Sequence, residues 1–179
     1  MRARLLLLLV VLSAALVPLP AAAAPAGAVA PVAVALWSAP MDGDLAVTRP
    51  FDPPPTRFAA GHRGVDLGGS PGSPVLAAGD GVVAFAGMVA GRPVISIDHA
   101  DGLRTTYEPV DASVAAGQEV SRGSPIGTLA VGHAGCPRAA CLHWGLRRPS
   151  TTAGAGALEY LDPLLLLGLG PVRLLPTDP

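Results

Sequence analysis

Glycine and proline interrupt this chain so often that they limit the elements it can form. Its 179 residues include 22 glycines and 20 prolines, which leave only short apolar runs after residue 45. A glycine costs a helix interior about 1 kcal/mol relative to alanine, and a proline removes a backbone donor. No segment beyond the first two dozen residues repeats its apolar positions every 3.6 residues. This pattern predicts short strands joined by turns.

The predicted strands are rich in β-branched residues and lie between turn sequences such as Gly79-Asp80-Gly81. They comprise residues 46–48, 74–78, 81–86, 94–98, 103–107, 113–114, 126–130 and 141–146. The intervals between turns are typical of antiparallel sheets. Residues 73–82 and 118–127 echo each other, because both combine a small-residue turn, a branched aliphatic residue and a glycine turn. We therefore expect an all-β, antiparallel domain with a barrel-sandwich-hybrid-like architecture.

The first 24 residues have the pattern of a signal peptide. Arg2 and Arg4 precede an apolar run from Leu5 to Val17, and residues 21–24 are alanines suited to signal peptidase. The run has thirteen residues, whereas a membrane-spanning helix needs about twenty. We expect cleavage within the alanines and export to the cell envelope or beyond, with no stable membrane span afterwards. An uncleaved anchor is the alternative.

The rest of the chain divides into three parts by composition. Residues 25–44 are rich in alanine, proline and valine and are expected to form a linker or a surface strand. Residues 45–167 hold the predicted β domain, and residues 168–179 form a C-terminal tail. The leucine-rich stretch 161–175 is interrupted by charged residues, glycine and proline, so it predicts a last core strand or a short helix rather than a membrane span.

The charge balance excludes one class of partner. All twelve basic residues are arginine, and the formal net charge is −1. Nucleic-acid backbones are bound by clustered cations, and only 4% of the residues are aromatic, which leaves no stacking platform. We expect no nucleic-acid partner.

Two histidines and one aspartate form a candidate metal-ligand set. His62 and Asp66 lie in the glycine-rich residues 61–69, and His143 lies in a later apolar segment. In an extended strand His62 and Asp66 would lie about 13 Å apart. A shared metal therefore needs a bend, which Gly64 permits. Two imidazoles and a carboxylate would leave one zinc position for water. A surface His–Asp pair without metal is the alternative.

For four other polar or aromatic residues, a purely structural role stands against a functional one. His99 follows a predicted strand and is expected to be a hydrogen-bonding turn residue. His133 lies on the loop before the cysteines and is either a replacement acid/base or a solvated loop histidine. Glu108 is interpreted as a surface charge pointing away from the face of its neighbour. Trp144 alternates with His143 along a predicted strand, so we place it in the core.

The two cysteines suggest a disulfide. Cys136 and Cys141 are separated by four residues that include Pro137, which suits a turn short enough to be bridged. Export to an oxidising compartment favours the bond. The alternative is a free Cys141 thiolate on the His143 face, which would act as a fourth ligand and close the metal site.

The order of these motifs resembles that of the lysostaphin-type zinc metallopeptidases, which cut peptide cross-links in bacterial peptidoglycan. The resemblance extends from about Arg49 to Leu165. It implies the duplicated hybrid motif fold with a groove, and Zn²⁺ held by His62, Asp66 and His143. Its main motifs are His62-Arg63-Gly64-Val65-Asp66-Leu67, Pro74-Val75, Gly79-Asp80-Gly81-Val82-Val83, Thr106-Tyr107, Gly117-x-x-Val120-x-x-Gly123 and Leu142-His143-Trp144-Gly145.

The chain departs from this family at two positions. Active members usually read Tyr-x-His-Leu where this chain has Pro109 in place of the histidine, and His-x-His where it has Cys141 in place of the first one. In the family these two imidazoles are the non-ligand pair that polarises the attacked carbonyl and handles protons. Loss of one such group typically lowers the rate by about 10²–10³.

Three hypotheses follow from the resemblance and its departures. The first is an exported zinc metalloendopeptidase of weak activity that acts on peptidoglycan peptides. The second is a degenerate module that binds peptidoglycan or regulates another wall hydrolase through a partner protein. The third is an exported β domain without metal. The resemblance favours the first.

Overall fold

The computed structural model describes residues 36–169, except residues 57, 101 and 151–156. The predicted signal peptide lies outside this part, as do residues 25–35 of the predicted linker and 170–179 of the predicted tail. Within the described ranges, no helix is long and apolar enough to cross a membrane.

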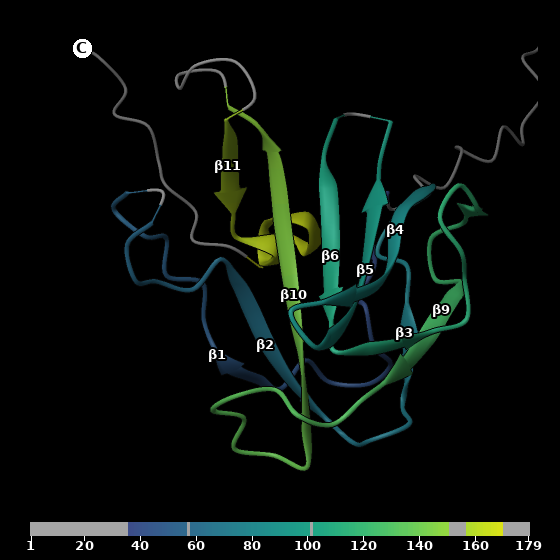
Figure 1. Ribbon diagram of the computed structural model, residues 1–179, viewed down its shortest axis with the longest axis horizontal. Coiled ribbons are helices and arrows are strands. Elements are labelled where there is room, and N and C mark those ends of the chain that lie inside the picture. Colours follow the sequence, from purple (N-terminus) through teal and green to yellow (C-terminus); the bar gives the residue numbers. More distant parts are fainter. Residues whose placement is uncertain (1–35, 57, 101, 151–156, 170–179) are drawn as a thin grey trace, which may run out of the picture. The chain divides into compact units, whose positions relative to one another are not determined.

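The main sheet contains eight strands, and every pairing within it is antiparallel. Its order is β1-β2-β10-β6-β5-β4-β8, and β11 lies off this path, paired with the C-terminal end of β10 (Figure 1). The strands are β1 (Val47–Arg49), β2 (Gly64–Gly69), β4 (Gly81–Val89), β5 (Arg92–Asp98), β6 (Arg104–Glu108), β8 (Glu119–Val120), β10 (Ala140–Pro149) and β11 (Leu158–Leu161).

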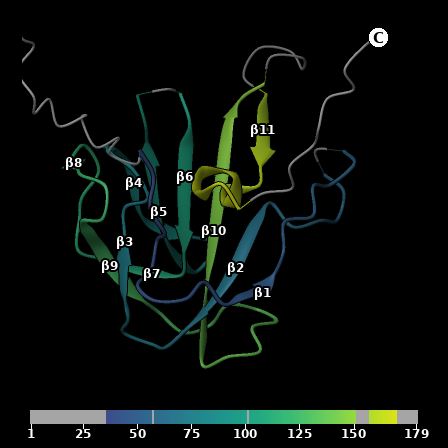
Figure 2. The ribbon, with the colours of Figure 1, turned by 180° about the vertical axis from the view of Figure 1, so that it is seen from behind.

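A second, smaller sheet and one short helix complete the described elements. The smaller sheet is antiparallel and has the order β3 (Pro74–Leu76), β9 (Pro125–Leu129) and β7 (Val110–Ala112). Both sheets contribute side chains to one buried apolar cluster. The 3₁₀ helix η1 (Pro163–Leu167) packs leucines against that cluster and crosses β10 on its core side, as the view from behind shows (Figure 2).

The structure confirms the all-β, antiparallel prediction and corrects some strand positions. Residues 64–69 were not among the predicted strands, because half of β2 is glycine, which disfavours a strand. Strands β1 and β10 pair with β2 on both sides and supply its backbone hydrogen bonds. Residues 113–114, predicted as a strand, form a bend after β7, and β11 was also missed.

Alternation along the strands gives the main sheet two different faces. Val65 of β2 and Trp144 of β10 are fully buried in the core, which confirms the core position expected for Trp144. Their neighbours Asp66 and His143 point to the opposite face. His143 is directly opposite Asp66 on one side and Glu108 on the other, and cross-strand partners share a face. We call this second surface the site face.

A chain of hydrogen bonds crosses the core between the sheets. The Asp80 carbonyl can only accept, so His99 donates to it from Nδ1 (2.8 Å). In the neutral ring, His99 Nε2 then accepts from the Thr105 hydroxyl (2.8 Å). Thr105 in turn accepts from Tyr107 (2.9 Å), whose oxygen accepts from the Ala78 N–H (3.0 Å). The expected hydrogen-bonding role of His99 is confirmed.

This network generates a prediction about alkaline stability. Burial raises the pKa of Tyr107 to about 12 from 10.0, although the hydrogen bond from the Ala78 N–H acts in the opposite direction. The unfolded chain therefore loses this proton at lower pH than the folded chain. The stabilisation is complete below pH 10 and is lost as pH rises towards 12, by up to about 1.4 kcal/mol per pH unit.

We expect Tyr107→Phe to weaken the fold at pH 8 by about 1 kcal/mol and to flatten this alkaline loss. Urea unfolding between pH 8 and pH 12 measures both effects. The chain has two tyrosines and no lysine, so few groups titrate in this range. Tyr160→Phe is the matched control and should keep the wild-type slope. An unchanged alkaline loss in Tyr107→Phe would contradict the prediction.

Candidate metal centre

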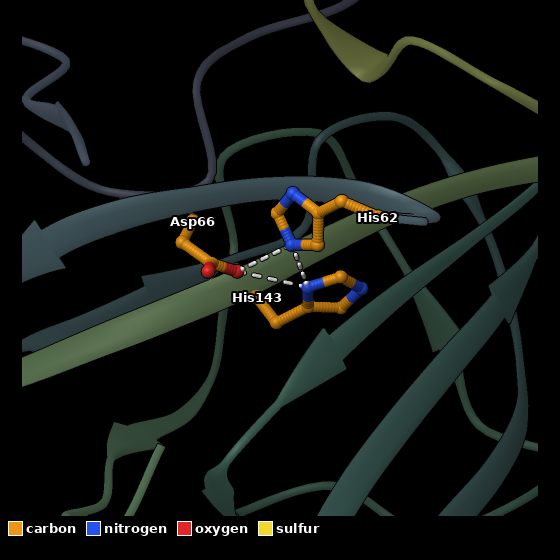
Figure 3. Close-up of side chains that lie close together, drawn as sticks. All are labelled: His62, Asp66 and His143. Atoms are coloured by element: carbon orange, nitrogen blue, oxygen red, sulfur yellow. Dashed lines mark hydrogen bonds and ion pairs between the residues drawn. The ribbon is translucent and has the colours of Figure 1, made fainter. Parts of the chain in front are cut away.

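Three side chains that are distant in the sequence meet on the site face (Figure 3). His62 precedes β2, Asp66 lies within β2, and His143 lies opposite Asp66 on β10. The Asp66 Oδ1 atom is 2.9 Å from His62 Nε2 and 2.9 Å from His143 Nδ1. The two nitrogens are 3.0 Å apart. The three residues considered as a ligand set are therefore brought together.

Backbone contacts before β2 bring His62 back towards Asp66. His62 forms an isolated antiparallel bridge with Asp52, in which each residue donates its N–H to the carbonyl of the other (2.6 and 3.0 Å). The chain then enters β2 at Gly64. This arrangement provides the departure from an extended strand that a shared metal requires.

Gly64 matters because another group approaches it closely. A Cβ atom at this position would lie 2.8 Å from His143 Nε2 and 2.4 Å from the Trp144 carbonyl oxygen. Both separations are shorter than a carbon atom tolerates. The missing side chain therefore makes room for the His143 ring.

The hydrogen bond of His62 to the backbone fixes which of its nitrogens faces Asp66. The Pro50 carbonyl accepts from His62 Nδ1 at 2.7 Å, so in the neutral ring Nε2 carries a lone pair. That lone pair faces the Asp66 carboxylate, and both residues are less than 5% exposed. Two electron-pair donors at 2.9 Å repel each other unless a proton or a cation lies between them. Two imidazoles and one carboxylate, of which His62 and Asp66 are buried, fit Zn²⁺.

The surroundings of Asp66 keep its carboxyl ionised, as a metal ligand requires. Burial raises its pKa. Hydrogen bonds with His133 and His143, and the electrostatic effect of His133 and His62, lower the pKa by more than burial raises it. The net result is a pKa well below the usual range.

His133 lies at this centre, although the simpler expectation placed it in solvent. Its Nε2 is 3.1 Å from Asp66 Oδ2, and its side chain is 12% exposed. Its ring stacks on that of His143, with centroids 5.8 Å apart and planes at 21°. The solvated-loop interpretation was wrong, because the loop folds over the site face.

A disulfide ties this loop to β10. Cys136 and Cys141 are bonded, with Cα atoms 5.7 Å apart, which confirms the predicted pair. The bond excludes Cys141 as a thiolate ligand. Because Cys141 is two residues from His143 and Cys136 is three from His133, the disulfide joins the two segments that carry the stacked imidazoles.

Glu108 is a site-face residue that sequence reasoning placed among surface charges. It is the cross-strand partner of His143, its side chain is 18% exposed, and it accepts from Arg92 Nε at 2.8 Å. Because Glu108 alternates with the buried Tyr107, the sequence alone placed the Glu108 side chain on the face opposite the core. That its cross-strand neighbour there is His143 follows only from the strand order. Neither Pro109 nor the bonded Cys141 offers a proton-transfer group.

Comparison with known proteins links this geometry to a protein family. The model of peptidase family M23 matches residues 60–155. Uncharacterized protein Rv2891 of Mycobacterium tuberculosis (strain ATCC 25618 / H37Rv) is 53% identical over 137 residues, which cover 76% of this chain and 53% of that protein. Uncharacterized protein Mb2915 of Mycobacterium bovis gives the same values. The chain thus spans about half the length of these curated relatives.

Solved structures show the same fold. A zinc-containing peptidase from Vibrio cholerae matches with a TM-score of 0.51 and 28% identity, over 60% of this chain and 35% of that one. The solution structure of lysostaphin matches with a TM-score of 0.54 and 25% identity, over 74% of this chain and 54% of that one. Lysostaphin from Staphylococcus simulans gives 0.56 and 24%, over 76% and 56% of the two chains, and supports the fold alone.

The close approach at Gly64 generates a prediction. Gly64→Ala should displace the His143 ring or separate β2 from β10, and we expect zinc affinity to fall by roughly tenfold or more. Competition with a chromogenic chelator measures that affinity. Gly87→Ala on β4 is the matched control, because its Cβ meets only the half-exposed Phe85 ring, at 3.1 Å. Equal zinc affinity in both variants would show that His143 does not depend on Gly64.

Proposed function

The chain belongs to peptidase family M23, and we propose that it is an exported zinc metalloendopeptidase of the lysostaphin type that hydrolyses peptide cross-links in bacterial peptidoglycan. The observation that carries this proposal is the approach of His62 Nε2, Asp66 Oδ1 and His143 Nδ1 to 2.9–3.0 Å of one another. Export is supported by the predicted signal peptide of residues 1–24 and by the disulfide, since such bonds persist in oxidising compartments.

His62, Asp66 and His143 would hold the metal. When bound, Zn²⁺ acidifies a coordinated water and polarises the scissile carbonyl. The chain itself orients the ligands. The Pro50 carbonyl fixes the tautomer of His62 and raises the basicity of Nε2. The paired strands β2 and β10 fix Asp66 opposite His143.

His133 supplies an imidazole where the family positions at Pro109 and Cys141 lack one. Its Nε2–H donates to Asp66 Oδ2, so it positions the carboxylate and carries a proton beside the reacting centre. The disulfide to Cys141 restrains the loop that presents it. In this proposal the Cys136–Cys141 disulfide holds the loop that places the His133 imidazole beside Asp66.

A degenerate binding module is the second candidate, and Pro109 and Cys141 are the observation that favours it. Such a protein would hold peptidoglycan or a regulatory partner protein in the groove without turnover. It differs from the enzyme in a measurable way, because it would bind cell-wall material whether or not fragments are released.

The first test uses purified sacculi. We expect the exported chain to release cross-link fragments in the presence of zinc and to stop after EDTA treatment, since two imidazoles and a carboxylate hold the metal. His143→Ala should lose zinc, measured by elemental analysis, together with fragment release. Co-sedimentation with sacculi and no release above the EDTA control would instead support the binding module. Fragment release that appears only in the Pro109→His, Cys141→His double variant would also support the binding module for the natural chain.

The second test addresses His133. We expect His133→Ala to lower the rate of fragment release by roughly 10²-fold while zinc stoichiometry stays the same, because His133 is outside the ligand set. His133→Gln separates two roles, since its amide can donate to Asp66 Oδ2 but cannot carry a proton. Continued low activity in His133→Gln would support proton handling. Recovery to the wild-type rate would limit His133 to positioning Asp66.

A further inference from the structure

A second row of charged residues crosses the site face beyond the metal centre. Arg147 of β10 is the cross-strand partner of Arg104 on β6 and of Tyr160 on β11. Arg147 is four positions after His143, so both side chains point to the same face, about 13 Å apart along the strand. The row at Arg147 and the row at His143 therefore belong to one surface.

Between these two rows the site face carries glycines on β2 and β10 and a threonine, Thr106, on β6. Gly145 of β10 is the partner of Gly64 on β2, so two glycines face each other across this stretch. A Cβ on Gly145 would lie 2.4 Å from the Thr106 hydroxyl, so the Thr106 side chain lies over Gly145. A peptide could lie over these small residues from the metal centre to Arg147.

Arg147 differs from the two arginines nearest to it because they already have carboxylate partners. Arg104 donates to both oxygens of Asp98, and Arg148 donates to Glu159 at 2.9 Å. The Arg147 charge contributes to the lowered pKa of Asp98, but Arg147 forms no ion pair with any residue that the structure describes, and its buried Nε has no hydrogen-bond partner among them. A donor buried without a partner is costly unless a ligand satisfies it.

The surroundings of Arg147 form a small cavity with a surplus of one positive charge. The cavity has a volume of about 190 Å³ and is lined by Arg147, the Asp98–Arg104 pair and Arg148, among others. The Asp98–Arg104 pair is neutral overall, and Arg148 is neutralised by Glu159. One unpaired guanidinium therefore matches a monoanion better than a dianion.

We infer that Arg147 binds a free carboxylate of the peptide that occupies the site face. The inference rests on the proposed function, because that function places a peptide on this surface. An extended peptide advances about 3.3 Å per residue, so the bound carboxylate lies about four residues from the metal centre. Arg147 thereby selects peptides that carry a negative charge at this distance.

Binding to a blocked model peptide tests the inference without any catalysis. The probes are N-acetyl-tetra-alanine with a free carboxylate and the same peptide as its C-terminal amide, added to the full chain and to its His143→Ala variant. Affinity is measured by calorimetry, and the arginine side-chain NMR signals report contact with Arg147. We expect the acid to bind roughly tenfold more tightly than the amide and to shift the Arg147 signals.

Arg147→Gln should abolish this preference, whereas Arg122→Gln, a matched control in the turn between β8 and β9 and outside this cavity, should keep it. A thermal-unfolding comparison shows whether Arg147→Gln is folded, and the wild-type NMR shifts test the contact independently of that variant. Equal binding of acid and amide, or a preference that survives Arg147→Gln, would overturn the inference. Tighter binding of inorganic phosphate than of the acid at Arg147 would also overturn it.

The same experiment separates this inference from the proposed function. His143→Ala removes a metal ligand, so a preference for the acid in that variant is independent of zinc and of turnover. If sacculi are not cleaved but the acid still binds through Arg147, the peptide site holds and the enzyme proposal fails. If sacculi are cleaved while acid and amide bind equally, the enzyme proposal holds and the carboxylate site at Arg147 fails.

Discussion

The antiparallel pairing of β2 with β10 is the constraint on which the rest of the site depends. It places Asp66 directly opposite His143 and brings Gly64 opposite Gly145. A slip of one residue would turn Asp66 into the core and Val65 towards the site face, because strand side chains alternate. The register is held by the fully buried Val65 and Trp144 on the other face. Packing of apolar side chains on one surface thus sets the positions of the polar ligands on the other.

The disulfide closes only a short loop, yet it restrains a segment of the candidate metal centre. A loop of this length gains little chain-entropy stabilisation from a cross-link. Here the bond attaches the His133 loop to β10 close to His143, so it fixes local shape. Cys141 thereby links β10 covalently to the segment that carries His133.

Charge is distributed along the site face in an ordered way. Next to His143, Glu108 is neutralised by Arg92. Four residues further along β10, Arg147 has no counter-ion among the described residues. Gly64, Gly145 and Thr106 lie between them. These features give the site face a polarity: the candidate metal-ligand set and a neutralised pair lie at one end, and a guanidinium without an ion-pair partner among the described residues lies at the other.

Much of this molecule was accessible from its sequence, because the determining physics is local. Frequent glycine and proline exclude helices, the spacing of Cys136 and Cys141 suits a bridge, and alternation separates Trp144 from His143. The glycine-rich β2 was not predicted, since its stability comes from neighbours on both sides. The position of His133 depends on how a loop folds over a distant strand, and the free state of Arg147 depends on which carboxylates its neighbours occupy. Only the tertiary structure determines where His133 lies and whether Arg147 has an ion-pair partner. Both depend on contacts between segments that are distant in the sequence, and no local sequence pattern predicts those contacts.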